Sequence, residues 1–267
     1  MFRYLSVYRI LFRNSLIREM SFKANFLLWT VVEFLWFSGQ ILFVEVLFAH
    51  TDQIGSWSKW RMMTLIATHQ ITAQLFQAVG YLNLTQLPEL IRTGKLDLLL
   101  TLPVDSQFMV SSRQFGFDNL LNSLLGLGLV SYSLHRLGAM PSPLQIVFYV
   151  LCLPLGAAIH YSVMFALSAL SFWIGRAQGL VYGYFNLFNI GRYPDSVFGG
   201  GFRFVFRWLI PVLLVANVPA RILTEAELDW GQLLSIFMQL ACAAALSLLL
   251  SRWLWVLGLR RYSSASS

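Results

Sequence analysis

The chain has 267 residues, of which 57% are apolar, 15% are aromatic and only 12% are charged. A soluble domain of this length carries about a quarter charged residues, so the composition excludes an ordinary soluble protein and indicates a membrane protein. The formal net charge of +7 fits membrane topology and the anionic inner leaflet, because Lys and Arg are retained on the cytoplasmic side of spanning helices. We therefore expect membrane lipids, and no nucleic acid, as partners of the basic residues.

Residues 1–23 contain four arginines spread along the segment, with neither an uninterrupted apolar run nor a small-residue cleavage site. This pattern argues against a signal peptide. It predicts an amphipathic helix lying along the cytoplasmic membrane face, with one side turned into lipid. The side chains expected on that lipid-facing side are Tyr4, Tyr8, Leu11, Phe12 and Leu16.

Residues 24–262 are predicted to form one transmembrane domain, because apolar runs near the ~20 residues of a spanning helix recur along them. The six predicted spans cover about 24–49, 60–81, 114–134, 144–173, 177–198 and 232–254. A charged loop at 84–106 separates the second and third spans, and a Pro- and Gly-broken stretch precedes the last. The tail at 263–267 is expected to be disordered.

Basic residues orient these spans. With the N-terminus inside, the inner segments hold 12 of the 19 Lys and Arg residues, which favours both termini in the cytoplasm. An even number of spans then requires one crossing from about residue 177, followed by a re-entrant element at 200–223. Irregular backbone is tolerated at membrane depth only where protein or a water-filled cavity surrounds it. The candidate gate residues of this region are Pro194, Pro211, Asn217 and Pro219.

The loop contains the sequence "LPELIRTGKLDLLLTLPVDS" at 87–106. Its helical spacing predicts one apolar stripe and a polar face, with Gly94 ending the preceding helix and Pro103 stopping the new one. The stripe consists of Leu96, Leu99, Leu100 and Pro103, and the polar face of Glu89, Arg92, Lys95 and Asp97. Two interpretations remain open at this point: a connector with a solvated face, or a docking element for a soluble partner.

Glu33 lies about ten residues into the first predicted span. An intramembrane carboxylate costs ~2.5 kcal/mol or more, so it is expected to face protein or a water-filled path. Polar residues at helical spacing form matching stripes on the first and second spans, namely Glu33, Gln40, His69, Gln70, Gln74 and Gln77. These side chains either hold the spans together by hydrogen bonds or form the polar wall of a translocation path.

The sequence lacks the motifs of several kinds of functional site. The sequence contains no G-x-x-x-x-G-K-[ST], HExxH or GxSxG motif, and Cys152 and Cys242 belong to no CxxC pair. We therefore expect no P-loop nucleotide site, no metal site, no disulfide framework and no catalytic residue in this chain. If the function of this chain depends on ATP, the ATPase is a separate polypeptide.

The loop resembles the segment after the second span in ABC-2-type permeases of ABC transporters. The matching positions are Glu89, Arg92, Gly94, Leu96, Asp97, Leu99, Leu100 and Pro103. The stretches "RYPDSVF" and "PVLLVANVPARIL" resemble the re-entrant region of a prokaryotic six-span subgroup of these permeases. The resemblance implies an all-α fold with a coupling helix that inserts into an ATPase subunit.

It also implies two ABC ATPase subunits, which bind ATP and Mg, and a second permease that is an identical copy or a related chain. The implied location is the bacterial cytoplasmic membrane, and the expected activity is export of an amphiphilic or lipid-like substrate. Two alternatives are a membrane enzyme acting on lipids and a membrane assembly subunit that transports nothing. The enzyme would need acid, base and polar groups converging near one interface, whereas Glu33, Glu45 and His69 differ in their expected depth.

Overall fold

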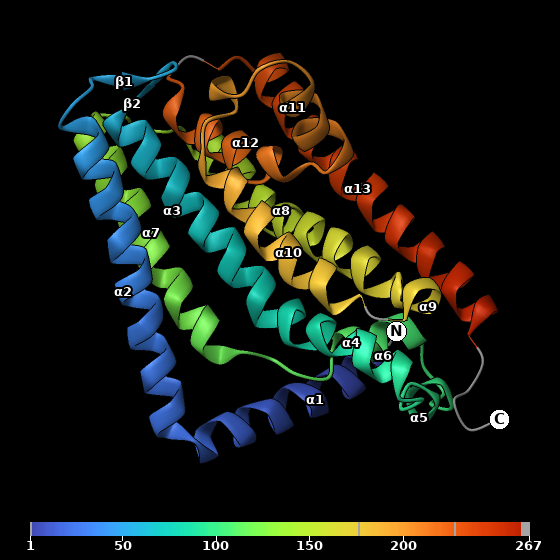
Figure 1. Cartoon of the computed structure of the whole chain (residues 1–267). Coiled ribbons are helices and arrows are strands. Elements are labelled where there is room, and N and C mark those ends of the chain that lie inside the picture. The colour runs from blue at the N-terminus through green and yellow to red at the C-terminus, as the bar shows by residue number, and fades with distance from the viewer. Residues whose placement is uncertain (1, 176, 227, 263–267) are drawn as a thin grey trace.

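The computed structural model describes residues 2–175, 177–226 and 228–262 and shows an all-α fold with one short β-hairpin. Most of the long helices run side by side, while α1 lies across one end of the molecule (Figure 1). The end of α13 lies at the same end of the bundle as α4, α5 and α6. The predicted disordered tail at 263–267 and Arg176 of the charge count lie outside the described residues.

Helix α1 (Phe2–Ser21) leads directly into α2 (Lys23–Phe48), which stands along one side of the bundle (Figure 1). The predicted N-terminal helix is confirmed, and part of its aromatic side contacts protein. The rings of Tyr8 and Phe12 pack edge-on against Phe115, with centroid distances of 5.1 and 5.5 Å, and Tyr4 packs on Phe108 at 5.2 Å. Tyr4, Phe12 and Leu16 nevertheless remain exposed, so these ring contacts cover only part of the side predicted to face lipid.

After α2, strands β1 (Gln53–Ile54) and β2 (Trp57–Ser58) pair antiparallel in a hairpin that turns at Gly55. The second predicted span follows as α3 (Lys59–Phe76), one π-helical turn η1 (Gln77–Tyr81) and α4 (Leu82–Arg92). The helical backbone continues through both junctions, so the second span extends without interruption into the charged loop.

The loop contains two short helices, α5 (Asp97–Leu100) and α6 (Ser106–Ser111). Helix α7 (Phe117–Leu137) ends at Gly138, which has a φ of 69°, as is common at helix C-termini. Helix α8 (Pro143–Ala169) then begins with a capping box between Ser142 and Gln145 and is followed by α9 (Ser171–Ile174).

The fifth predicted span differs from the structure. Helix α10 (Gln178–Phe188) has 11 residues, a length of about 16 Å, which is roughly half the thickness of the hydrocarbon core. Two 3₁₀ turns follow, η2 (Asn189–Arg192) and η3 (Asp195–Val197). Residues 177–198 therefore form a short helix followed by 3₁₀ turns, and Pro194, where the sequence predicts a break, lies between these two turns.

The remaining helices are α11 (Gly200–Phe204), the π-helical η4 (Val205–Leu209), α12 (Val212–Thr224) and α13 (Trp230–Arg261). Between Gly200–Leu209 and Val212–Thr224 the chain bends by 85° at a short break. We call these two segments the bent helix pair. It lies within the region predicted to be re-entrant.

Three helical segments of the described chain are long and apolar enough to cross a membrane, namely Lys23–Phe48, Pro143–Ile174 and Trp230–Arg261. The bent helix pair would make a fourth if it were one span. Six spans are not evident from length and hydropathy alone. Helix α3 is not one of these three segments, although its residues 62–74 are all buried.

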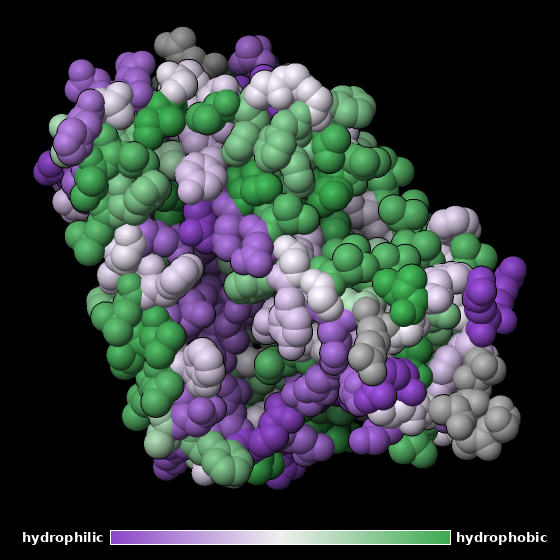
Figure 2. All heavy atoms as spheres, in the orientation of Figure 1, coloured by the Kyte–Doolittle hydropathy of each residue, from purple (hydrophilic) through white to green (hydrophobic). Residues whose placement is uncertain are grey.

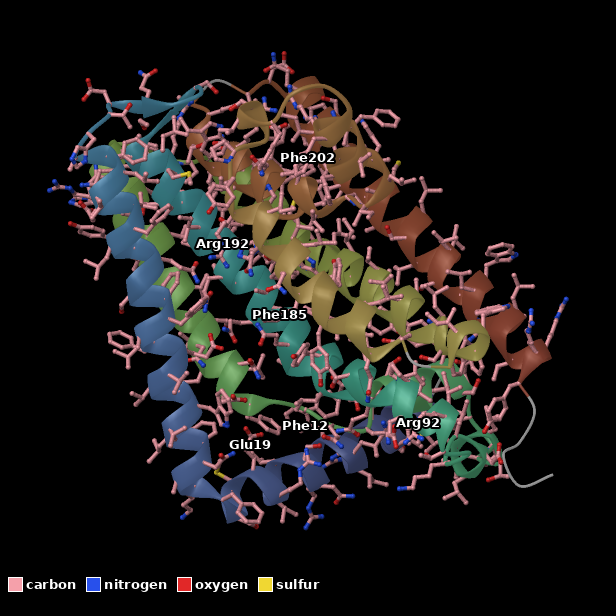
Figure 3. The ribbon with its side chains drawn as sticks, in the orientation of Figure 1. Phe12, Glu19, Arg92, Phe185, Arg192 and Phe202 are labelled. Carbon is pink, nitrogen blue, oxygen red and sulfur yellow. The ribbon has the colours of Figure 1, made fainter. Side chains whose placement is uncertain are left out.

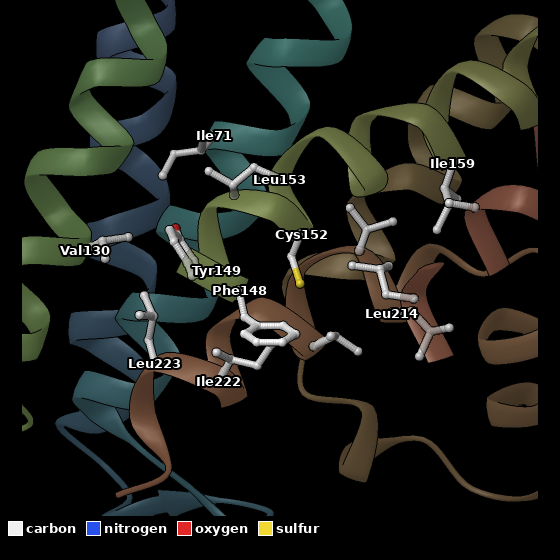
Figure 4. Packing of buried hydrophobic residues seen from close by; sticks show 14 of the residues in the cluster. Ile71, Val130, Phe148, Tyr149, Cys152, Leu153, Ile159, Leu214, Ile222 and Leu223 are labelled. Atoms are coloured by element: carbon white, nitrogen blue, oxygen red, sulfur yellow. The ribbon is translucent and has the colours of Figure 1, made fainter. Parts of the chain in front are cut away.

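The main core lies where α3, α7, α8, α12 and α13 meet. Ile71, Val130, Tyr149, Leu153 and Leu223 belong to one buried cluster there (Figure 4). Helix α2 is different, because only Phe37 and Val44 are buried on it. Most of the apolar surface of α2 is therefore left for lipid or another chain.

Candidate functional site

The 84–106 loop begins with a sharp turn where α4 ends. Gly94 has a φ of 72°, a left-handed conformation that costs a residue with a side chain about 1–2 kcal/mol. The turn lets the Leu96 amide donate to the Leu90 carbonyl over 3.1 Å. Gly94 therefore breaks the helix as predicted and reverses the chain into α5.

Leu96 fixes the loop to the bundle. Its side chain is 0% exposed and belongs to the same buried cluster as Leu87, Ile91 and Trp255. Leu99 and Leu100 pack against this cluster and are half-buried, which confirms three members of the predicted apolar stripe. Pro103 is exposed, so its assignment to the stripe is wrong, because the helical turn ends at Leu100 before reaching it.

The opposite side of the loop is exposed. Leu98 is 72% exposed, and Lys95 and Leu102 are exposed beside it in sequence. The sequence analysis missed Leu98, which lies in the single turn of α5, whereas Lys95 and Leu102 lie outside that turn. The spacing of Leu96, Leu99 and Leu100 leaves Leu98 on the other side of the turn, but an exposed leucine has no signature of its own in the sequence.

Charges flank this exposed face. Arg92 donates to both Glu89 oxygens, over 2.9 and 2.6 Å, and this hydrogen bond holds the pKa of the Glu89 carboxyl below its usual range. Exposed pairs of this kind stabilise a fold little, and both side chains remain accessible. Asp97 lies beside the Tyr262 hydroxyl, whose pKa is raised to about 12 by burial and by the Asp97 carboxylate.

The loop ends at Asp105, which caps α6 by accepting a 3.0 Å hydrogen bond from the Phe108 amide. Arg252 on α13 donates to both Asp105 oxygens, over 2.7 and 3.1 Å. Partial burial raises the pKa of Asp105, but Arg252 and the capping amide outweigh that effect and leave the pKa below its usual range. Asp105 was not among the predicted site residues, and its partner lies 147 positions away in sequence.

A polar seam runs between α2 and α3, which we define by Glu33, Gln40, Gln70, Gln74 and Gln77. The Gln74 amide donates to the Glu33 carboxylate over 3.0 Å. Gln70 and Gln74 are buried, whereas Glu33, Gln40 and Gln77 are half-buried. The predicted stripes of the first two spans therefore do face each other.

Two cavities lie along this seam. The larger has a volume of about 610 Å³ and is lined by Trp29, Glu33, Gln77 and Tyr81 among others, with α1 and the start of α7 closing one side. The second, about 360 Å³, is lined by residues that include Gln40, Met62 and Ile66. Figure 2 shows the same side of the molecule hollowed into a hydrophilic strip beside the apolar surface of α2.

His69 lies deeper in the bundle. Its Nε2 is 3.1 Å from the Phe188 carbonyl oxygen, and its ring packs on the Phe188 ring. It is therefore a hydrogen-bonded interior residue. Arg192 lies at the opening toward α2, where it lines the smaller cavity (Figure 3).

The predicted gate residues gather around one side chain. Asn217 on α12 accepts from the Asp195 amide over 2.9 Å and donates to the Tyr193 carbonyl over 3.1 Å. It therefore holds the backbone on both sides of Pro194. Pro211 precedes α12 at the bend and Pro219 lies inside that helix, so all four predicted positions belong to this region of the fold.

Asp195 is also the centre of an ionic cluster. Its Oδ2 accepts from Arg203 over 3.0 Å and from Arg207 over 2.5 Å. Arg207 in turn donates to Gln239 on α13 over 3.0 Å. The bent helix pair is thus attached both to η3 and to the last long helix.

Comparison with known proteins gives one family. A sequence profile described as "ABC-2 family transporter protein" matches residues 34–266, which is most of the chain. A search of curated proteins found no match.

Proposed function

The chain belongs to the ABC-2 family of transporter proteins, and from this premise we propose that it is the permease subunit of an ATP-driven exporter with separate ATPase subunits. It is a multi-pass membrane protein, and its family implies ATPase partners. We assign separate roles in transport to the 84–106 loop, the polar seam and the bent helix pair.

The exposed face of the loop is the observation that carries this proposal. Leu98 is held outward by a turn whose other side is anchored through the fully buried Leu96. An exposed apolar side chain on a loop that also presents Lys95 and the Glu89–Arg92 pair suits a groove on a soluble protein, because such contacts combine a buried apolar centre with a polar rim. In the proposed complex this groove belongs to an ABC ATPase, which binds ATP and Mg, while the permease itself binds no cofactor.

The proposed topology has six spans with both termini in the cytoplasm of a bacterial inner membrane. Helices α2, α3, α7, α8, α10 with its extension, and α13 supply the crossings. The low hydropathy of α3 is compatible with a span because its polar side chains are buried in protein and avoid lipid. The 84–106 loop, α1 and the end of α13 share one end of the bundle, which supports placing them all on the cytoplasmic side.

The proposed translocation path is the polar seam with its two cavities. Helix α2 buries little of its surface within one chain, which supports a second permease, identical or related, that completes the path. Aromatic walls at Trp29 and Tyr81 beside the Glu33 carboxylate suit an amphiphilic substrate. The bent helix pair, held around Asn217 and Asp195, acts as the gate at the outer side.

The test replaces Leu98 and Lys95 by alanine in the same variant and measures co-purification with the ATPase subunit and the rate of ATP hydrolysis of the complex. We expect both to fall together, since the anchoring Leu96 is untouched. Leu5→Ala is the matched control, because Leu5 is 67% exposed on α1 and carries no role in the proposal. Unchanged association and turnover in the loop variant would remove the coupling assignment and place the ATPase contact elsewhere on the permease.

A further inference from the structure

Helix α13 makes polar contacts near both ends of the bundle. Gln239 bonds to the bent helix pair and Arg252 to the end of the 84–106 loop. Thirteen residues separate them, which is about 20 Å along a helix axis. Figure 1 shows α13 running from the bent helix pair to the end of the molecule that carries α4, α5 and α9.

The contact at the loop is specific in its geometry. Arg252 reaches both Asp105 oxygens and also donates to Gln107 over 3.2 Å, a two-pronged geometry that fixes orientation as well as distance. One turn later, the Trp255 ring nitrogen donates to Ser106 over 3.0 Å. The segment 105–107 therefore moves with α13.

The contact at the gate is a bridge through one guanidinium. Arg207 binds Asp195 with one nitrogen and Gln239 with another. Since Asp195 is itself held by Asn217 of α12, a displacement of α13 acts on η3 and on both parts of the bent helix pair.

Helix α13 has the stiffness that such a role requires. Its 32 residues form one α-helix with no internal proline, so a frequent cause of a sharp kink is absent. Only 17% of its most apolar stretch is buried. The buried side of α13 packs in the main core through Leu233, Leu240 and Ala244, so a displacement of α13 would also involve the helices it packs against.

We propose that α13 carries the movement of the 84–106 loop to the bent helix pair, with Arg252 and Gln239 as the positioning residues at its two attachments. This inference rests on the proposed function, because it assumes that an ATPase moves the loop. It assigns to the last span a task separate from lining the path.

The experiment measures how accessible η3, which is attached to the bent helix pair, is to a labelling reagent. Cys152 and Cys242 are replaced by serine, and the exposed Ser196 of η3 is replaced by cysteine as a reporter. The permease with its ATPase subunit is reconstituted in proteoliposomes, and labelling by a membrane-impermeant maleimide is timed with and without MgATP and vanadate. In this parent we expect MgATP and vanadate to change the labelling rate about tenfold, a typical size for coupling between two sites.

Arg252→Gln and Gln239→Leu are then each introduced into this parent. We expect the ATP-dependent change in labelling to fall below about twofold, while ATPase binding and ATP hydrolysis continue. Arg260→Gln is the matched control, since Arg260 is exposed in the last turn of the same helix, and it should retain the full change. Arg252→Lys keeps the charge but not the two-pronged contact, so it should keep the fold and restore only part of the response, which separates loss of positioning from loss of folding.

Each outcome decides between the two claims. If Arg252→Gln and Gln239→Leu both keep the parent's response, the role of α13 is wrong and the proposed function stands. If the parent binds no ATPase or shows no ATP-dependent change in labelling, the proposed function fails and the inference fails with it.

Discussion

The Glu33 carboxylate on α2 accepts a hydrogen bond from the Gln74 amide on α3, with 3.0 Å between Oε2 and Nε2. This bond connects a helix that buries little of its own surface to one that is almost wholly buried. It favours a structural role for these two side chains, while the adjoining cavity of about 610 Å³ favours a role in the path. The two roles are separable by substitution.

Glu33→Gln should preserve folding, because glutamine retains an oxygen that accepts the bond from Gln74. We expect the thermal stability of the purified permease to change little, since a single interhelical hydrogen bond in a membrane is worth about 0.6 kcal/mol on average. If the negative charge contributes to substrate binding, stimulation of ATP hydrolysis by amphiphilic compounds should fall. Equal losses of stability and stimulation would leave Glu33 with the structural role alone.

Gly191→Ala should destabilise the bundle. A Cβ at this position would lie 2.8 Å from the Val212 carbonyl oxygen and 3.3 Å from the His69 ring, so α3, η2 and α12 would have to separate. Overpacking of this kind costs about 1–3 kcal/mol. Unfolding in denaturant should show the loss, whereas Gly183→Ala on α10, where a Cβ meets nothing within 4 Å, should not.

Asn217→Leu should loosen the gate. It removes the partner of the Asp195 amide and of the Tyr193 carbonyl, and a buried polar group left unpaired costs about 1–3 kcal/mol. Hydrogen exchange of residues 193–197 should accelerate. Asn186→Leu is the matched control on the exposed side of α10, and comparable acceleration in that variant would contradict the specific role of Asn217.

The attachment of α1 should depend on pH through Glu19. Glu19 accepts from the Phe117 amide over 3.1 Å, and burial, followed by the charge of Asp118, raises its pKa against the effect of this bond. A carboxyl whose pKa is higher in the folded state adds stability at low pH, and the gain is lost as pH rises through the raised value. The protection of the amides at the start of α7, measured relative to the intrinsic exchange rate at each pH, should therefore increase on acidification.

Glu19→Gln should remove this pH dependence while keeping an acceptor for the Phe117 amide. Asp52 offers a control carboxyl, since it is exposed in the turn before the β-hairpin and its replacement by asparagine should leave the profile as in the unmodified chain. A profile that persists in the Glu19→Gln variant would assign the effect to another group.

The sequence predicts features that depend on neighbouring residues. Gly94 marks the break before α5 because glycine readily adopts a positive φ, and the spacing of Leu96, Leu99 and Leu100 identifies the anchored side of the loop. Helical spacing also predicts that Glu33 faces the amides of the second span. These predictions succeed because periodicity determines which face of a helix a side chain occupies.

Other features depend on residues far apart in sequence. The pair of Asp105 with Arg252 joins positions 147 apart, and the docking of Tyr8 on Phe115 joins two segments that composition assigned to different environments. Amphipathicity identifies the apolar side of a helix but not whether protein or lipid covers it. The shortness of α10 likewise reflects Pro194 and the tight packing around Gly191, neither of which appears in a hydropathy average.

The most direct measurement of the central claim is photo-crosslinking from position 98. Benzoylphenylalanine is placed there in membranes that contain the permease with its ATPase subunit, and at Leu5 of α1 as the control position. The proposed coupling role predicts an adduct with the ATPase from position 98, weakened when ATP binding changes the contact, and none from position 5. An ATPase that associates with the permease but forms no adduct from position 98 would contradict the account.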